Sequence, residues 1–199
     1  MELYLLRHGE SQANVVQVYA SIEGNWPLSD EGRRQAEKQA ARLKNRHLDA
    51  IFCSTLVRTR ETADIVGQAC GIIPVSSERL VEIGLGDLDG TSQKDPAAND
   101  AFQAVLACWD ARESDARFPN GESLAEAAAR VGDFLDNLSP DVGERVLIVG
   151  HSITLAAALW VLLQNPAERF KQIILKRGHL AIAERKPEGF HLVEMNAAP

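Results

Sequence analysis

The sequence predicts an α/β protein: a three-layer α/β/α sandwich with a mostly parallel central sheet, built as one domain over residues 1–199. Short apolar runs of strand length alternate with segments of helical periodicity along the chain. These runs are nearly continuous in apolar residues, which is typical of strands buried on both faces of a parallel sheet. The chain is also long enough for one domain with a substantial core, and no repeat or linker divides it.

The strands are predicted from these apolar runs. RVLIV at residues 145–149 carries the clearest strand pattern, and Gly150 then connects it to an apolar helix at residues 153–163. Other strands are expected at residues 3–6, 48–53 and 72–76, with two late strands at about residues 179–183 and 190–194.

Helices are expected between the strands. Ser29 is placed to cap a helix that runs through residues 33–35. A second helix begins near Leu56 and stops near Gly71. After the turn PNGES, a strongly amphipathic helix follows, with its apolar positions at Leu124, Ala127, Ala128, Val131, Phe134, Leu135 and Leu138.

Composition excludes several classes of protein. The net charge of −7 argues against a nucleic-acid binder, because the chain as a whole would not neutralise a phosphate backbone. The three cysteines are odd in number and lack metal-ligand spacing, so we expect reduced thiols in a cytoplasmic protein, with Cys53 in the core. We expect no signal peptide and no membrane partner, because no apolar stretch approaches the roughly 20 residues of a membrane span.

Cation-capable side chains follow the three clearest strands. Arg7 and His8 come directly after the first apolar run, Arg58 follows the second, and His151 follows RVLIVG. Ligands of open parallel sheets bind beyond the carboxyl ends of the strands, where these side chains would meet. Arginine forks match phosphate oxygens, and helices that begin at this edge add their positive ends. The sequence therefore predicts an anion pocket suited to a phosphoryl group.

One histidine of this pocket could also carry the phosphoryl group covalently. Neutral imidazole is a nucleophile, and a backbone hydrogen bond at one ring nitrogen would leave the other free to attack. The leaving oxygen then needs a proton, which a nearby carboxylic acid can supply before it acts as a base toward water. Glu82 lies in a suitable loop, although a solvated loop glutamate is the alternative interpretation.

The sequence resembles the histidine phosphatase superfamily, in the branch shared with cofactor-dependent phosphoglycerate mutases. The motifs that carry the resemblance are LRHGESQAN, CSTLVRTRETA, RLVEIGLGDLDG, PNGESLAEAAARV and RVLIVGHS, in family order over nearly the whole chain. The resemblance implies that His8 is the phosphorylated nucleophile and that Arg7 and Arg58 clamp the phosphoryl oxygens. It implies that His151 stabilises the transition state and that Glu82 is the general acid and base.

The resemblance also implies that Asn14 contacts the transferred or substrate phosphate. The chain departs from the family pattern at Leu88-Asp89-Gly90, where tryptophan-glutamate-glycine is common, and at Ser152, where glycine is frequent. No substrate residue is assigned in the segment 20–28. Residues 84–119 show little periodicity, and we expect them to lie over one end of the sheet and cover the substrate.

Three other functions have less support in the sequence. The stretch GHSIT resembles a serine-hydrolase elbow, but Thr154 replaces its second glycine, and a Ser152 triad would need Glu168 with His179 or His191. A metal site lacks paired histidine spacing, and no cofactor is expected. A non-catalytic phospho-ligand binder or regulator would not need both histidines and Glu82.

Within the family, the choice lies between a hydrolase and a mutase, which differ in whether water or a second phosphoglycerate receives the phosphoryl group. The compact chain resembles small broad-specificity or alpha-ribazole phosphatases. We therefore expect a metal-independent phosphomonoester hydrolase that acts on a small phosphorylated metabolite. A homodimer is compatible with the sequence.

Overall fold

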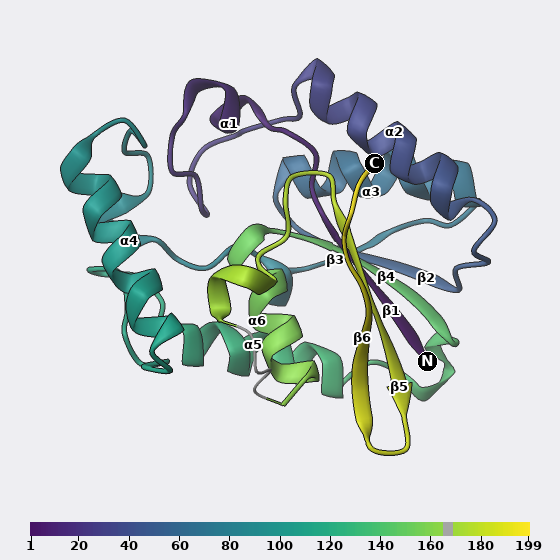
Figure 1. Cartoon of the computed structure of the whole chain (residues 1–199). Coiled ribbons are helices and arrows are strands. Elements are labelled where there is room, and N and C mark those ends of the chain that lie inside the picture. Colours follow the sequence, from purple (N-terminus) through teal and green to yellow (C-terminus); the bar gives the residue numbers. More distant parts are fainter. Residues whose placement is uncertain (165–168) are drawn as a thin grey trace.

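The computed structural model describes residues 1–164 and 169–199, which form a mixed α/β fold around a six-stranded sheet (Figure 1). The strand order is β3-β2-β4-β1-β5-β6, and β3, β2, β4 and β1 run parallel to one another. The strands are β1 (Glu2–Arg7), β2 (Ala50–Ser54), β3 (Val75–Ser77), β4 (Arg145–Gly150), β5 (Leu180–Lys186) and β6 (Gly189–Ala197). The predicted fold class is thus confirmed.

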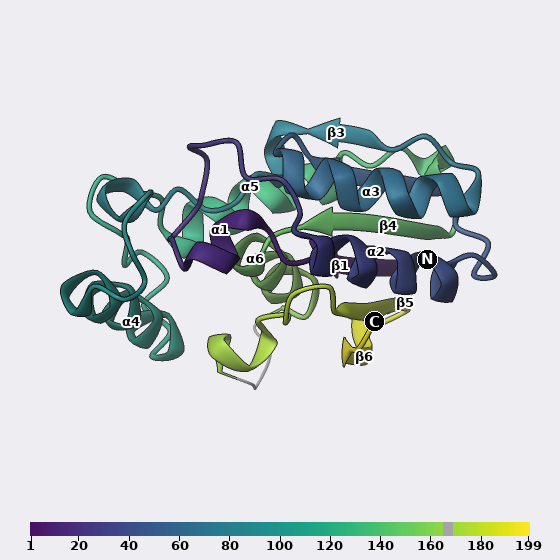
Figure 2. The same ribbon diagram turned by 90° about the horizontal axis from the view of Figure 1, so that it is seen from above.

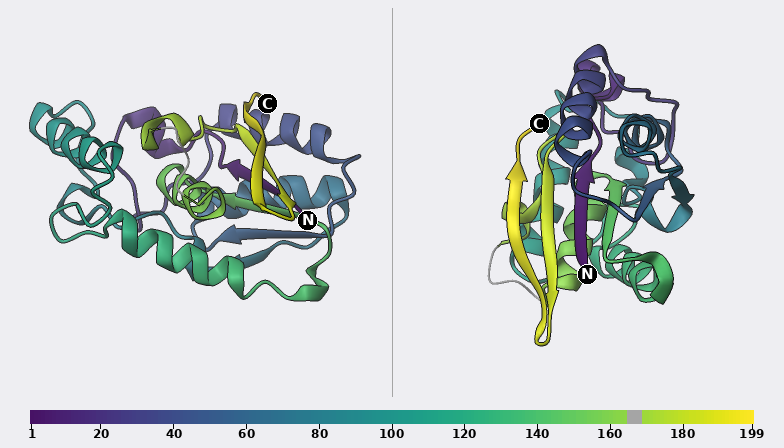
Figure 3. Two further views of the ribbon diagram at one scale, coloured as in Figure 1. Left: turned by 60° about the horizontal axis from the view of Figure 1, so that its bottom comes forward. Right: turned by 90° about the vertical axis from the view of Figure 1, so that its right-hand side faces the viewer.

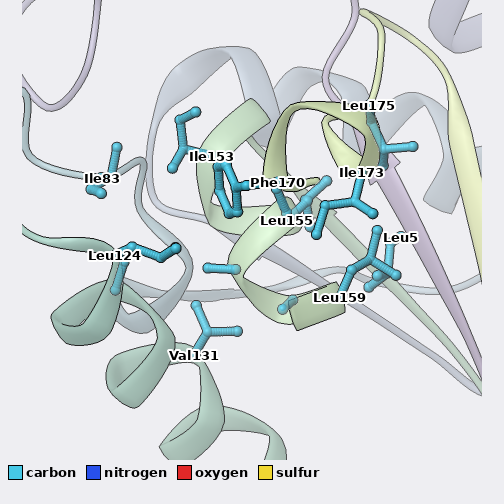
Figure 4. Close-up of a cluster of buried hydrophobic side chains, with 14 of the residues drawn as sticks. Leu5, Ile83, Leu124, Val131, Ile153, Leu155, Leu159, Phe170, Ile173 and Leu175 are labelled. Atoms are coloured by element: carbon cyan, nitrogen blue, oxygen red, sulfur yellow. The ribbon is translucent and has the colours of Figure 1, made fainter. Parts of the chain in front are cut away.

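Two pairs of helices cover the two faces of the sheet (Figure 2). On β1, Leu3 and Leu5 face the core under α5 and α6, while Tyr4 and Leu6 face the core under α2 and α3. Figure 4 shows part of the first of these cores around Leu5. The helices are α1 (Gln12–Val16), α2 (Asp30–Leu43), α3 (Val57–Cys70), α4 (Pro96–Asp110), α5 (Leu124–Asp136) and α6 (Ser152–Leu162).

The helix ends form where the sequence indicates them. The Ser29 side chain accepts a hydrogen bond from the Gly32 N–H at the start of α2. Ser123 and Glu126 form a reciprocal capping box at the start of α5. At the end of α3, Gly71 adopts a left-handed φ of 73°, a conformation that favours glycine. Local side-chain chemistry therefore fixes the limits of these helices.

β5 runs antiparallel to β1, β6 runs antiparallel to β5, and these two last strands form a ribbon at one edge of the sheet (Figure 3). At the other edge, β3 is only three residues long and begins later than the run at residues 72–76 suggested. Val75 and Ser76 are exposed there, so burial adds little to this pairing.

The predicted core position of Cys53 is correct, and burial raises the pKa of its thiol to about 11.

Residues 84–119 are more regular than their weak periodicity suggested, because they include the helix α4. The sequence does carry local signals for this helix: Asp95 accepts a hydrogen bond from the Ala97 N–H, and Pro96 occupies the first turn. α4 lies beyond the carboxyl ends of the parallel strands, away from the sheet (Figure 2). No helix within the described residues is long and apolar enough to cross a membrane.

Candidate active site

A cavity of about 460 Å³ opens beside the carboxyl ends of β1 and β4. Its lining includes five of the six predicted site residues, namely Arg7, His8, Asn14, Arg58 and Glu82. The sixth, His151, packs edge-to-face against His8 with 5.3 Å between the ring centroids. The structure therefore brings together all six residues from positions far apart in the sequence.

The backbone around His8 fixes its imidazole ring. The residue follows β1 directly, and its backbone N–H donates to the Gly150 carbonyl oxygen at 3.0 Å. Its Nδ1 lies 2.7 Å from the Gly9 carbonyl oxygen, an acceptor only, so this nitrogen is assigned the proton and Nε2 is left unprotonated. Burial, reinforced by Arg58 and Arg7, holds the pKa of His8 well below its usual value. His8 is therefore a neutral imidazole with a free nucleophilic nitrogen.

Close backbone approach determines the shape of the loop after His8. A Cβ atom on Gly9 would lie 2.3 Å from the Gly32 carbonyl oxygen, and one on Gly32 would lie 2.0 Å from the Glu10 carbonyl oxygen. Both positions therefore require glycine. The Gly9 N–H also lies 3.3 Å from the Thr62 hydroxyl on α3. These contacts tie the His8 loop to the start of α2 and to the second turn of α3.

His151 is fully buried at the N-terminus of α6. Neither ring nitrogen has a hydrogen-bond partner among the described residues. Burial first, and then the charge of Arg58, holds its pKa well below the usual value for histidine. Buried polar atoms without partners are uncommon in folded proteins, and here they are consistent with a ligand that supplies the missing partner.

Two arginines supply positive charge at the same end of the cavity. Arg7 Nη1 donates to the Leu175 carbonyl oxygen at 2.7 Å, and its buried Nε has no partner in the described structure. Burial lowers the pKa of Arg7 to about 10, so the guanidinium stays charged near neutrality. Arg58 Nη2 donates to the Ser21 carbonyl oxygen at 3.0 Å. Backbone carbonyl groups thus orient both guanidinium groups, with donors left for an oxyanion.

Glu82 is only 6% exposed, so the alternative of a solvated loop glutamate is wrong. Its Oε1 accepts hydrogen bonds from the N–H groups of Ile83 and Thr154, both at 3.0 Å. Its Oε2 accepts from the Ser152 hydroxyl at 2.9 Å. The carboxyl group is therefore held at the N-terminus of α6, beside the two histidines, and lines the same cavity.

Asn14 lies in the short helix α1 and lines the same cavity. Its Oδ1 accepts from the Ser11 N–H at 3.0 Å, which completes a cap at the start of that helix. This bond orients the side chain and leaves its amide N–H groups as donors for a ligand. The segment around residue 21 is also fixed: Asp89 carboxylate oxygens accept from the N–H groups of residues 21–23 at 2.8, 3.0 and 3.1 Å. Asp89 therefore supports the segment whose carbonyl group orients Arg58.

The outer wall of the cavity was not predicted from the sequence. This wall carries amides, aromatic rings and a further cation, from Gln17, Tyr19, Gln93, Asn99, Phe102, Gln103 and Arg177. Tyr19 stacks on Phe102 at 4.7 Å between centroids. The available signals were the recognisable start of α4 and the Lys176-Arg177 pair directly before a predicted strand. Neither signal shows by itself that the side chains face a cavity.

Two alternatives raised by the sequence concern a metal site and a Ser152 triad. Among the described residues, no group of three or more His, Cys, Asp or Glu side chains could hold a metal ion. The Ser152 hydroxyl donates to Glu82, and Glu168 lies outside the described residues. His191 pairs with Glu188 at 3.1 Å, remote from Ser152 in the sheet ribbon.

Known proteins are similar in sequence over most of this chain. The protein is 32% identical over 188 residues to "Probable phosphoglycerate mutase GpmB" of Photorhabdus laumondii, a match that covers 91% of this chain and 83% of that protein. It is 33% identical over 184 residues to the protein of the same name from Yersinia pestis, with the same coverage of 91% and 83%.

Solved structures agree in fold. The alpha-ribazole phosphatase of Shigella flexneri has a TM-score of 0.83 and 28% identity, with 100% of this chain and 98% of that chain covered. The mycobacterial glucosyl-3-phosphoglycerate phosphatase in complex with VO3 has a TM-score of 0.83 and 26% identity, with 99% of each chain covered. The model of the histidine phosphatase superfamily (branch 1) matches residues 3–198. From the site geometry, the fold and these matches together, this chain belongs to branch 1 of the histidine phosphatase superfamily.

Proposed function

We propose that this protein is a phosphomonoesterase that hydrolyses a small phosphorylated metabolite through a phosphohistidine on His8. The observation that carries the proposal is the state of the His8 ring: buried, neutral, with Nδ1 bound to the Gly9 carbonyl oxygen and Nε2 free. Arg7 and Arg58 line the cavity beside this nucleophile, and their positive charges favour an anionic substrate group.

In the first step, His8 Nε2 attacks the phosphorus atom and the bond from phosphorus to the leaving oxygen breaks. Glu82 gives its proton to that oxygen, so the product leaves as an alcohol. Arg7, Arg58 and His151 stabilise the negative charge on the transferring phosphoryl oxygens. The phosphoryl group then resides on His8, and Glu82 is ionised.

In the second step, water attacks the phosphohistidine. Glu82 now acts as the base and takes a proton from the water, while the bond from phosphorus to Nε2 breaks. Inorganic phosphate leaves, His8 returns to its neutral form and Glu82 is protonated again. The two steps therefore restore every group of the site.

We propose that the reaction uses no metal ion. Arginine and histidine side chains already supply the positive charge that a divalent ion would bring to the phosphoryl oxygens. The expected result is full activity in excess EDTA. Loss of activity in the chelator, with recovery on adding a divalent cation, would contradict this part of the proposal.

A mutase is the second candidate, and the names of the GpmB relatives favour it. The phosphatase names of the structural neighbours and the compact chain support hydrolysis. The two reactions differ in the acceptor of the phosphoryl group. Labelled phosphoenzyme mixed with unlabelled 3-phosphoglycerate should release inorganic phosphate if the protein is a hydrolase, and labelled bisphosphoglycerate if it is a mutase.

The side chains of the outer wall favour a small polar substrate. Amide side chains such as Gln93 and Asn99 can exchange hydrogen bonds with hydroxyl groups, while Phe102 offers an apolar surface to a ring. The cavity of about 460 Å³ lies in the size range of small-molecule sites. We therefore propose a metabolite whose phosphate occupies the His8 end and whose hydroxyl-bearing remainder faces α4.

The decisive experiment traps the intermediate. Wild-type protein quenched in alkali during turnover of radiolabelled p-nitrophenyl phosphate should carry label on His8, located by peptide mapping. His8→Ala should neither trap label nor turn over. His191→Ala, a change in the sheet ribbon, is the matched control and should behave like wild type. Wild-type turnover by His8→Ala would exclude the mechanism, and phosphate binding without turnover by wild type would favour a non-catalytic binder.

A further inference from the structure

Ser152 is a polar residue of the cavity that the reaction described above does not use. It is the first residue of α6, it is half-buried, and it lines the cavity together with Glu82. Its hydroxyl oxygen lies 2.9 Å from Glu82 Oε2. The carboxyl group that must gain and lose a proton thus has a hydroxyl group as its neighbour.

The two oxygens of Glu82 have different partners. Oε1 accepts from the backbone N–H groups of Ile83 and Thr154, both at 3.0 Å. A backbone N–H can only donate, so these two groups favour an Oε1 without a proton. Near Oε2, the Ile153 N–H is distant at 3.4 Å, and the Ser152 hydroxyl is the close partner.

A second hydroxyl group near Glu82 is already in use. Thr154 Oγ1 lies 3.1 Å from Glu82 Oε1 but 2.7 Å from the Val81 carbonyl oxygen. A hydroxyl group has one proton to donate, and the carbonyl oxygen is both nearer and unable to donate in return. We therefore assign the Thr154 proton to Val81, which makes Ser152 the adaptable partner of the carboxyl group.

A hydroxyl group can donate or accept, and it reorients by rotation about a single bond. From these contacts we infer that Glu82 carries its catalytic proton on Oε2, and that Ser152 is a positioning residue that holds Oε2 in both protonation states. The inference rests on the proposed phosphatase function. The proton given to the leaving oxygen departs from Oε2, the proton taken from water returns there, and Ser152 keeps its own.

The inference predicts an effect that depends on the leaving group. Ser152→Ala should lower kcat for β-glycerol phosphate about ten- to a hundredfold, the range for losing a hydrogen bond to a charged group. KM should change little, because the bond assists proton transfer rather than binding. With p-nitrophenyl phosphate the loss should be a few-fold at most, since that oxygen leaves without much help from a proton.

Three further variants complete the test. Ser152→Thr keeps the hydroxyl group and should restore most of kcat, whereas Ser152→Gly removes the group without adding a side chain and should repeat the alanine result. Thr154→Val is the matched control, because it removes the neighbouring hydroxyl group, and it should show no dependence on the leaving group. Melting temperatures compare the folding of all four variants.

The inference is overturned if Ser152→Ala and Ser152→Gly lose activity equally with both substrates, or with neither. It is also overturned if Thr154→Val shows the same dependence on the leaving group. Trapping of the phosphoryl group on His8 distinguishes failure of the inference from failure of the proposed function. If wild type forms the phosphohistidine and Ser152→Ala has wild-type kinetics with both substrates, the inference alone fails. If wild type forms no phosphohistidine, the proposed function fails first.

Discussion

The inner and outer ends of the cavity are built in different ways. At the inner end, His8, His151 and Glu82 are buried. Backbone groups bind the side chains of His8 and Glu82, and His151 lies at the start of α6. At the outer end, Gln17 and Arg177 are exposed and come from a helix end and from the segment before β5. The chemistry of phosphoryl transfer needs groups fixed before the substrate arrives, whereas recognition of the remainder tolerates adaptable side chains.

The inner end also places charged and polar groups out of water with few partners. Buried Arg7 Nε and both ring nitrogens of His151 lack hydrogen bonds within the described structure. Such groups destabilise the folded state until a ligand satisfies them. An oxyanion bound at the inner end should therefore stabilise the protein. The amides of the outer end are solvated, so there is no comparable reason to expect stabilisation by a ligand there.

The largest expected effect is at the inner carboxyl group. Glu82→Gln keeps the size of the side chain but cannot donate a catalytic proton as an acid, so phosphoryl transfer from an alkyl phosphate should slow about 10²–10⁴-fold. The loss should be smaller for p-nitrophenyl phosphate. Rapid-quench measurement of label on His8 from both substrates gives the comparison, with the exposed Glu78→Gln as the control. An equal loss with both substrates would indicate lost positioning instead.

The second effect concerns the oxyanion clamp. Arg58→Lys keeps the charge but loses the planar fork that binds the Ser21 carbonyl oxygen and that we propose binds the phosphoryl oxygens. We expect kcat/KM to fall about 10²-fold for every phosphate ester, as for loss of one oxyanion donor. Arg60→Lys, two positions along the same helix but exposed, should retain wild-type kinetics. Similar kinetics for the two variants would remove Arg58 from the inner end.

The third prediction is a pH dependence of stability that originates at the inner end. His8 and His151 have lowered pKa values in the folded protein, so below about pH 6.5 the unfolded chain binds protons that the folded chain does not. The free energy of unfolding should therefore fall as the pH drops below that value, by up to about 1.4 kcal/mol per pH unit for each histidine. At higher pH the two histidines should cause no pH dependence, because they are neutral in both the folded and the unfolded protein.

Urea unfolding between about pH 7.5 and about pH 5 measures this dependence. His151→Gln removes one of the two groups and should reduce the slope in the acid range. The same slope in both proteins would mean that His151 takes up its proton equally well in the folded state, contrary to its burial among positive charges.

The smallest effects are expected at the outer end. Gln103→Ala removes an exposed amide of α4, and it should raise KM for the physiological metabolite only a few-fold, the loss of one solvent-exposed hydrogen bond. Turnover of p-nitrophenyl phosphate should not change. Steady-state kinetics with both substrates test this, after a screen of phosphorylated metabolites has identified the better one. A loss of kcat with p-nitrophenyl phosphate would place the side chain at the inner end.

Much of the architecture could be predicted from the sequence, because the signals are local. Alternation of apolar runs with helical periodicity gave the parallel core strands, and Ser29 and Gly71 marked helix ends through their own side chains or backbone freedom. The short strand β3 begins later than predicted and α4 was not predicted, since neither buries a continuous apolar run. The start of α4 is nevertheless marked in the sequence by Asp95 and Pro96.

The sequence by itself also determined which residue types stand at the strand ends, because Arg7, His8 and His151 directly follow apolar runs. Only the tertiary structure decided their chemical state. Burial beside Arg58 makes His8 neutral, and Glu82 meets Ser152 across 70 positions of sequence. Desolvation and long-range hydrogen bonds exist only when distant segments pack together, so no local pattern reports them. For the same reason, the sequence indicates only that Glu82 can act as an acid. The fold shows that its Oε2 atom is the one beside the Ser152 hydroxyl, a group that can both donate and accept a hydrogen bond.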